Sequence, residues 1–381
     1  MNQSGINSLP DEVLDQIFNH PDVPLGDLFN TALTCRRLHY TCLPLYFGRF
    51  GILDPSECCD IVFQPPLDDQ NIKDALSGLR IALFIQSTKK LVCRFNDLDD
   101  YRLVIKNMDR LHSFISHLTV MDDVTLVFAS QRCGCCSDFD PGETVDDELK
   151  KWSQSIGRIL NTTLSKSCTS LTITGGRYMG HSYSFKSGHK ASETESDKSR
   201  GAFSAIKNLF GKGKQAGSNI TNADNPTDVL RGGNWQFNRA TGTGNAIVLT
   251  SLSISAKNTS VLRSLNIRSM MFTVPPLLHW LISALQLQSI ESLSLTNLQV
   301  HRKYWPAILF LIATNAPHLL ELRLSRLRQL DPADILAFIS SFPRLTVLHI
   351  GHNVDSVDNF DLGPFPDFPY LISLYAPAAW I

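Results

Sequence analysis

The sequence predicts an α/β protein in which a short helical unit precedes an array of alternating strands and helices. Three observations lead to this prediction. The first 50 residues contain three short apolar stripes at helical spacing, an apolar pattern L-x-x-L-x-L returns regularly after residue 245, and a long polar stretch lies between the two. The predicted domains are residues 1–55, 56–175, 176–245 and 246–381.

Composition limits the class of protein. Of the 381 residues, 35 are Lys or Arg and 36 are Asp or Glu, so the formal charge is −1, too balanced for a dedicated polyanion binder. The 43% of hydrophobic residues is enough for a buried core. No apolar run approaches the roughly 20 residues that cross a bilayer, and we expect neither a membrane span nor a secretory signal. Nine cysteines, an odd number, then predict reduced thiols and a cytoplasmic or nuclear location.

Three short helices are predicted within the first 50 residues. The first begins at Pro10, whose missing N–H costs nothing in a first turn, and the two acidic residues after it complement the helix dipole. A second helix is expected after Asp27, a suitable N-cap, and a third from about Cys35 to just before Pro44. A unit of about 45 residues buries too little surface to be stable alone. We therefore expect it to dock on the rest of the chain or on the helices of another protein.

The same segment contains, in order, Leu9-Pro10-x-Glu12-Val13-Leu14-x-x-Ile17-Phe18, Asp27-Leu28, Ala32-Leu33 and Cys35-Arg36-x-Leu38-His39. This series resembles the F-box. It departs from the family pattern in a spacer before Asp27 that is longer than usual, and in Leu38, which stands where many members have tryptophan. In the family the motif binds the adaptor Skp1, which attaches the F-box protein to a cullin-based ubiquitin ligase. The resemblance implies the same partners here.

Carried over residue by residue, the resemblance implies a set of apolar and polar contacts with Skp1. These residues are Leu9, Pro10, Glu12, Ile17, Leu28, Leu33, Arg36 and Leu38. Helices this small use one face both for packing and for binding. Each residue is therefore equally open to a second interpretation, as part of an internal three-helix core.

After residue 245 the chain repeats one apolar pattern. Its instances start at Leu249, Leu262, Ile290, Leu319, Leu345 and Leu371. From the second onward the starts lie 28, 29, 26 and 26 residues apart, and helical patterns over 277–287, 305–314 and 333–340 fill the intervals. Strand followed by helix at this period is typical of leucine-rich-repeat solenoids, whose units stack because none buries its apolar face alone. The pattern is irregular, since only Asn353 stands where the family often has asparagine.

The repeats are expected to begin before residue 246. Ile115-x-x-Leu118-x-Val120 and Cys168-x-x-Leu171-x-Ile173 fit the same template 53 residues apart, close to twice the repeat length. A predicted helix with apolar residues from Leu149 to Leu164 precedes the second instance. We interpret residues 56–175 as irregular α/β structure made of early, degenerate repeats.

Residues 176–245 differ from the rest in composition. Gly, Ser, Thr, Asn and Lys dominate them, and few large apolar side chains occur. Such a segment buries too little apolar surface to offset the entropy that ordering costs. We predict a disordered insertion that interrupts the array.

The sequence offers little catalytic chemistry. Cys133, Cys135 and Cys136 form its densest thiol cluster, but no second ligand pair at zinc-site spacing accompanies them. A thiol enzyme using Cys135 would need a nearby base, which nothing in the sequence indicates. Phosphate-binding loops, nucleophile elbows and metalloprotease motifs are absent from the sequence. We therefore expect no enzymatic activity, no metal and no cofactor.

An F-box followed by leucine-rich repeats resembles the ligase receptors whose concave strand face recruits a protein substrate. The resemblance makes outward strand residues candidates for substrate contact, here Glu321, Arg323, Arg344 and His349, although a given outward residue is more often merely solvated. The leading hypothesis is a non-catalytic adaptor of a Skp1–cullin–F-box ubiquitin ligase. The alternative is a leucine-rich-repeat scaffold in which the N-terminal helices only cap the solenoid.

Overall fold

The structure is a computed structural model that describes residues 6, 9–63, 74–96, 101–128, 144–176, 183–184, 236–237, 260–273, 277–300, 302–351, 366–377 and 380. Most of the predicted insertion over 176–245 lies outside these residues. Three other features of the sequence also lie outside them. They are the repeat that starts at Leu249, the residue Asn353, and the thiol cluster of Cys133, Cys135 and Cys136. Within the described part of the chain, no helix is long and apolar enough to span a membrane.

Three helices form the N-terminal unit, namely α1 (Asp11–Phe18), α2 (Leu25–Ala32) and α3 (Arg36–Gly48). Leu14 and Phe18, one turn apart on α1, are buried in the core that the three helices share. Two expected boundaries are wrong. The second helix begins directly after Pro24, which places Asp27 in its first turn instead of at the N-cap. The third continues through Pro44, which is exposed, so that water can satisfy the carbonyl its missing N–H leaves unpaired.

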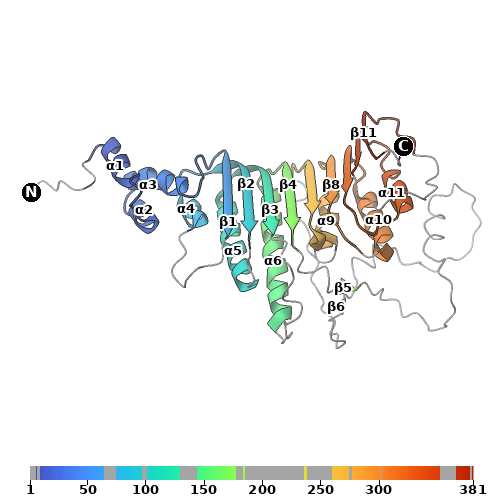
Figure 1. The fold of residues 1–381 in the computed structure, drawn as a ribbon, viewed down its shortest axis with the longest axis horizontal. Helices are drawn as coiled ribbons and strands as arrows, with labels where there is room; N and C mark the ends of the chain where they lie inside the picture. Colours follow the sequence, from blue (N-terminus) through green and yellow to red (C-terminus); the bar gives the residue numbers. More distant parts are fainter. Residues whose placement is uncertain are drawn as a thin grey trace, which may run out of the picture.

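The rest of the chain is an α/β region built on one parallel sheet of nine strands. The strands are β1 (Cys58–Phe63), β2 (Ser87–Phe95), β3 (Val120–Phe128), β4 (Ser170–Gly175), β7 (Ser264–Arg268), β8 (Ser292–Thr296), β9 (Glu321–Ser325), β10 (Val347–Ile350) and β11 (Ser373–Tyr375). They lie side by side in chain order, with α1–α3 beyond β1 (Figure 1). A separate antiparallel pair joins β5 (Tyr183–Ser184) and β6 (Gln236–Phe237).

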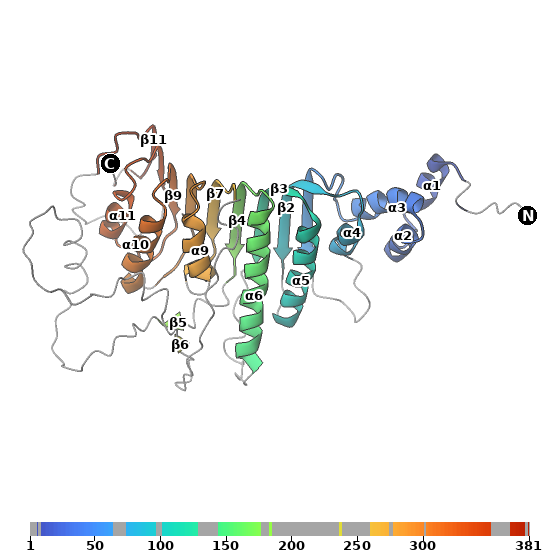
Figure 2. The same ribbon diagram turned by 180° about the vertical axis from the view of Figure 1, so that it is seen from behind.

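Helices connect successive strands and cover one face of the sheet. They are α4 (Ala75–Ile81), α5 (Tyr101–His117), α6 (Thr144–Ser165), α9 (Leu277–Leu285), α10 (Trp305–Asn315) and α11 (Pro332–Ile339), with short 3-10 turns η2 (Met270–Thr273) and η3 (Arg302–Tyr304). Figure 2 shows the helices in front of the strands. Alternate strand residues are buried beneath the helices and the others are partly exposed, as in β8 and β10.

The apolar pattern of the sequence corresponds to two buried rows that cross the sheet. In the first row Leu265, Leu293, Leu322 and Leu348 pair in register, and each is fully buried. The second row, two residues further along each strand, consists of Ile267, Leu295, Leu324 and Ile350, which are equally buried. One earlier instance of the pattern is misplaced. Ile115 belongs to α5, and Val120, the first residue of β3, is 41% exposed, whereas the buried residues of β3 include Met121, Val124 and Leu126. The error arises because apolar residues three apart also line one face of a helix.

A third buried row consists of aromatic rings at one end of the sheet. Phe63 stacks on Phe95 with ring centroids 4.6 Å apart, and Phe95 stacks on Phe128 at 5.0 Å. The row ends at Gly175, the partner of Phe128 on β4, whose φ of +78° favours glycine. The rings therefore fill the space beneath the first three strands only.

Candidate functional site

The eight residues that the family resemblance singles out fall into two groups. Leu28 and Leu38 are 0% and 3% exposed, so both are core residues of the three-helix unit. Ile17 and Leu33 are 44% and 56% exposed. Of the remaining four, Leu9 is half-buried, and the exposed ones are Pro10, Glu12 and Arg36. Five of the eight are thus exposed, two belong to the core, and Leu9 is half-buried against it.

Two further apolar residues are exposed beside this set. Val13, 37% exposed, lies one turn before Ile17 on α1, and Tyr40, 42% exposed, lies one turn after Arg36 on α3. Val13 and Ile17 are four residues apart in a predicted helix, and this spacing indicates that Val13 shares the exposed face of Ile17. Tyr40 carries no such signal, and sequence reasoning missed it as a surface residue.

Adjacent arginines at the start of α3 have different partners. Arg37 donates to the carboxylate of Asp11 from Nε at 2.8 Å and from Nη2 at 2.5 Å, and Nη2 also donates to the carbonyl of Leu9 at 2.5 Å. Arg36 instead extends over the ring of Tyr40, with its guanidinium carbon 5.7 Å from the centroid. Arg37, which the family pattern does not single out, therefore holds the entry to α1, and Arg36 remains on the surface.

His39 joins the N-terminal unit to the following segment. Its Nδ1 lies 3.1 Å from the carbonyl oxygen of Ala32, and the backbone N–H of Leu83 donates to its Nε2 at 3.2 Å. A carbonyl only accepts and an amide N–H only donates, so Nδ1 is the donor and Nε2 the acceptor. The imidazole is 6% exposed and thus forms a buried link between α2 and the residues after α4.

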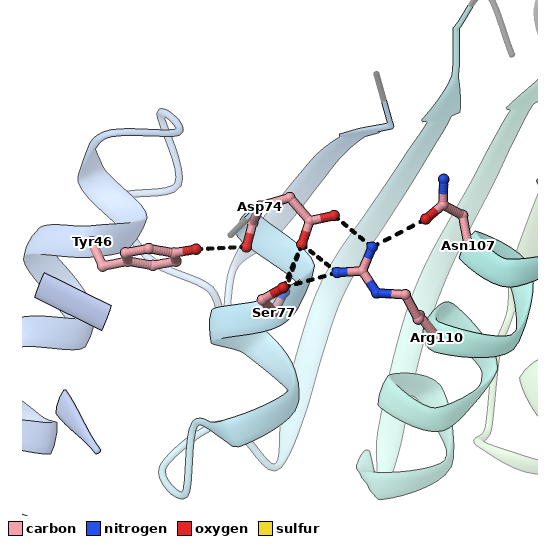
Figure 3. Close-up of polar contacts among 5 residues, drawn as sticks. All are labelled: Tyr46, Asp74, Ser77, Asn107 and Arg110. Carbon is pink, nitrogen blue, oxygen red and sulfur yellow. Dashed lines mark hydrogen bonds and ion pairs between the residues drawn. The ribbon is translucent and has the colours of Figure 1, made fainter. Parts of the chain in front are cut away.

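A second link is centred on Asp74, the residue before α4 (Figure 3). Its backbone carbonyl accepts from the hydroxyl of Tyr46 at 2.8 Å, and its carboxylate caps α4 by accepting from the N–H of Ser77 at 2.9 Å. Arg110 on α5 donates to both carboxylate oxygens, at 2.5 and 2.8 Å, and to Asn107 at 3.1 Å. Burial and the nearby Asp74 raise the pKa of Tyr46. The network fastens α3 to α4 and α5.

The partly exposed face of the sheet brings together three of the four residues that are candidates for substrate contact. Arg323 on β9 pairs in register with His349 on β10, whose ring lies 5.6 Å from that of Tyr375. Glu321 is on the same face, 3.7 Å from the Arg323 guanidinium. Arg344 lies in the turn before β10 and does not join this row.

The structure places the described thiols mainly in the core. Burial raises the pKa of Cys59 and of Cys168 to about 12, so neither is an activated nucleophile. Among the described residues, no group of three or more His, Cys, Asp or Glu side chains is placed to hold a metal ion.

Comparison with known proteins identifies the N-terminal unit. A family model described as F-box-like matches residues 6–47, a range that contains α1, α2 and nearly all of α3. No curated protein matches the chain. The match confirms the resemblance of the three helices to the F-box and supports a role as a Skp1-binding adaptor. It does not extend to the parallel sheet.

Proposed function

We propose that this chain is a non-catalytic substrate-recognition adaptor of a Skp1–cullin–F-box type ubiquitin ligase. The observation that carries the proposal is the F-box-like match over helices that leave Ile17 and Leu33 exposed although both are large and apolar. Within a unit that matches a partner-binding family, these exposed apolar residues are the ones that another protein would cover. In this proposal the cytoplasm or nucleus is the site of action, and other subunits perform the ubiquitin transfer.

The sheet region would hold the substrate. We interpret its strands as irregular leucine-rich-repeat units, because an apolar residue of each strand joins a common buried row at a regular sequence interval. The opposite face offers Glu321, Arg323 and His349 on two adjacent strands. Charged and aromatic side chains on a rigid sheet are suited to bind a protein segment by its surface chemistry.

The alternative function is a repeat scaffold in which the N-terminal helices serve only as a cap. The contacts of Tyr46 with Asp74 and of His39 with Leu83 are compatible with such a cap, because they attach α3 to the α/β region. Both functions use these contacts. Binding to Skp1 distinguishes them, since a cap has no need of the adaptor.

The test is a calorimetric titration of Skp1 into the full chain. We expect binding by the wild type, and binding weaker by about tenfold or more in Ile17→Asp. Val120→Asp is the matched control, because Val120 is similarly exposed at 41% but lies at the start of β3. A folded wild type that does not bind Skp1 would refute the adaptor function and leave the scaffold.

A further inference from the structure

Exposed side chains continue past the matched range of residues 6–47, at the junction with α4. Leu83, in the segment between α4 and β2, is 65% exposed, and its backbone N–H is the group that donates to Nε2 of His39. The other ring nitrogen of His39 contacts the carbonyl of Ala32, directly before the exposed Leu33. The two ring nitrogens of His39 thus connect the end of α2, next to Leu33, with the backbone of Leu83, although 50 residues separate Leu33 from Leu83 in the sequence.

Aromatic rings extend this surface along α3. The ring of Phe84, half-buried, lies 5.4 Å from that of Tyr40, which in turn is covered by the guanidinium of Arg36. We call the exposed set of Leu33, Arg36, Tyr40 and Leu83 the junction patch. Leu33 and Arg36 belong to the F-box pattern, whereas Leu83 lies outside the matched range.

We propose that the junction patch is one continuous part of the Skp1-binding surface, and that Leu83 is an adaptor contact supplied from outside the F-box-like unit. The proposal rests on the proposed function. The patch is connected to the F-box-like unit through contacts, because the guanidinium of Arg36 covers the ring of Tyr40 and that ring lies beside Phe84, the residue after Leu83. A protein that covers Arg36 and Tyr40 is therefore the partner placed to contact Leu83. The expected complement is an apolar helix face with an acidic residue placed to pair with Arg36.

Two contacts fix the conformation of the segment that contains Leu83. The hydrogen bond between the backbone of Leu83 and His39 holds the segment, and the contact between Phe84 and Tyr40 anchors the next residue. A side chain presented on a backbone that is already ordered loses less entropy on association than one on a free loop. Covering Leu83 therefore costs little additional ordering of the chain.

The experiment compares Skp1 binding by the full-length wild type, Leu83→Asp and Leu53→Asp. Leu53 is the matched control, since it is 89% exposed but follows Ile52, whose N–H donates to the carbonyl of Phe47 at 3.1 Å. Phe47 lies eight residues beyond His39, about 12 Å further along α3. We expect Leu83→Asp to weaken binding by about tenfold or more, and Leu53→Asp to change it by less than about twofold.

Hydrogen exchange on the wild type with and without Skp1 is a second readout that does not depend on a variant. The amides of residues 82–86 should exchange more slowly in the complex. Wild-type affinity in Leu83→Asp together with unchanged exchange at 82–86 would overturn the extended surface and leave the adaptor function intact. A wild type that does not bind Skp1 would overturn both.

Discussion

The hydroxyl of Tyr46 donates a 2.8 Å hydrogen bond to the backbone carbonyl of Asp74, 28 residues further along the chain. Tyr46 is fully buried on α3, and Asp74 caps α4. The bond therefore joins the F-box-like unit to the α/β region. Because the carboxylate of Asp74 is held by Arg110 at the same time, the junction is anchored from both sides.

Replacing Tyr46 with Phe tests the strength of this junction. The carbonyl of Asp74 would keep the N–H of Ser77 at 3.0 Å but lose the phenol, so we expect the free energy of unfolding to fall by about 1 kcal/mol. Chemical denaturation measures the change. Tyr40→Phe serves as the control, because Tyr40 is 42% exposed; we expect no measurable effect. Equal stability of the Tyr46→Phe variant and the wild type would show that the bond contributes nothing.

The raised pKa of Tyr46 adds a pH dependence. Ionisation of the phenol removes the proton that it donates, and burial disfavours the charged form in the folded state. The unfolded tyrosine ionises more readily, so the stability supplied by the neutral phenol is lost as the pH rises above about 10. The difference in unfolding free energy between wild type and Tyr46→Phe should therefore shrink between pH 9 and 11.

The repeated strands were predictable from sequence because their burial has a fixed period. Leu293, Leu322 and Leu348 occupy equivalent positions, and their pairing in register makes each one bury against the next. The earlier strands were harder to place. Ile115 and Leu118 fit the strand template around the end of a helix, whereas the equivalent buried residues of β3, Val124 and Leu126, follow later in the chain.

The candidate site was only partly predictable. The family pattern identifies Ile17 and Leu33, but it does not tell surface from core, and Leu28 and Leu38 are buried. The contact between His39 and Leu83 spans 44 residues and uses a backbone amide, so no side-chain pattern could reveal it. Contacts that depend on backbone groups distant in sequence require the folded structure.

Gly175→Ala tests the end of the aromatic row. A Cβ atom at this position would lie 1.8 Å from the carbonyl oxygen of Phe128, and φ is +78°. We expect destabilisation by about 2–3 kcal/mol from steric overlap and backbone strain. Gly48→Ala is the control, since no atom lies within 4 Å of its Cβ position. Thermal unfolding should separate the two, and similar midpoints would contradict the packing of β4 on β3.

Asp334→Asn tests the effect of a buried carboxyl on α11. Asp334 is 9% exposed, and burial, with a smaller contribution from Asp331, raises its pKa from 3.8 to about 6. A raised pKa means that the folded state favours the neutral acid, so stability is lost as the pH rises from about 4 to 6. Above this range the Asn variant should exceed the wild type by on the order of 2 kcal/mol.

Thermal melts at pH 4 and pH 8 measure this difference. The advantage of Asp334→Asn should appear at pH 8 and largely vanish at pH 4. Asp331→Ala offers the contrast, because Asp331 accepts from the N–H of Ala333 at 3.0 Å and pairs with Arg302. Removal of this cap should cost about 1 kcal/mol at pH 8. If the difference in stability between Asp334→Asn and the wild type were the same at pH 8 and at pH 4, the raised pKa of Asp334 would be contradicted.

Arg36 and Arg37 are adjacent on α3, and we expect Arg37 to stabilise the fold and Arg36 to contact Skp1. Arg37→Ala removes three hydrogen bonds that hold Leu9 and Asp11, but Asp11 is largely exposed. We therefore expect a loss of only about 0.5–1 kcal/mol of unfolding free energy. Arg36→Ala removes a surface cation whose contact is the ring of Tyr40, so stability should stay nearly unchanged while Skp1 affinity falls several-fold. Denaturation and calorimetry on both variants check the division of roles. A stability loss in Arg36→Ala as large as in Arg37→Ala would show that both residues maintain the fold, and unchanged affinity in Arg36→Ala would remove it from the binding surface.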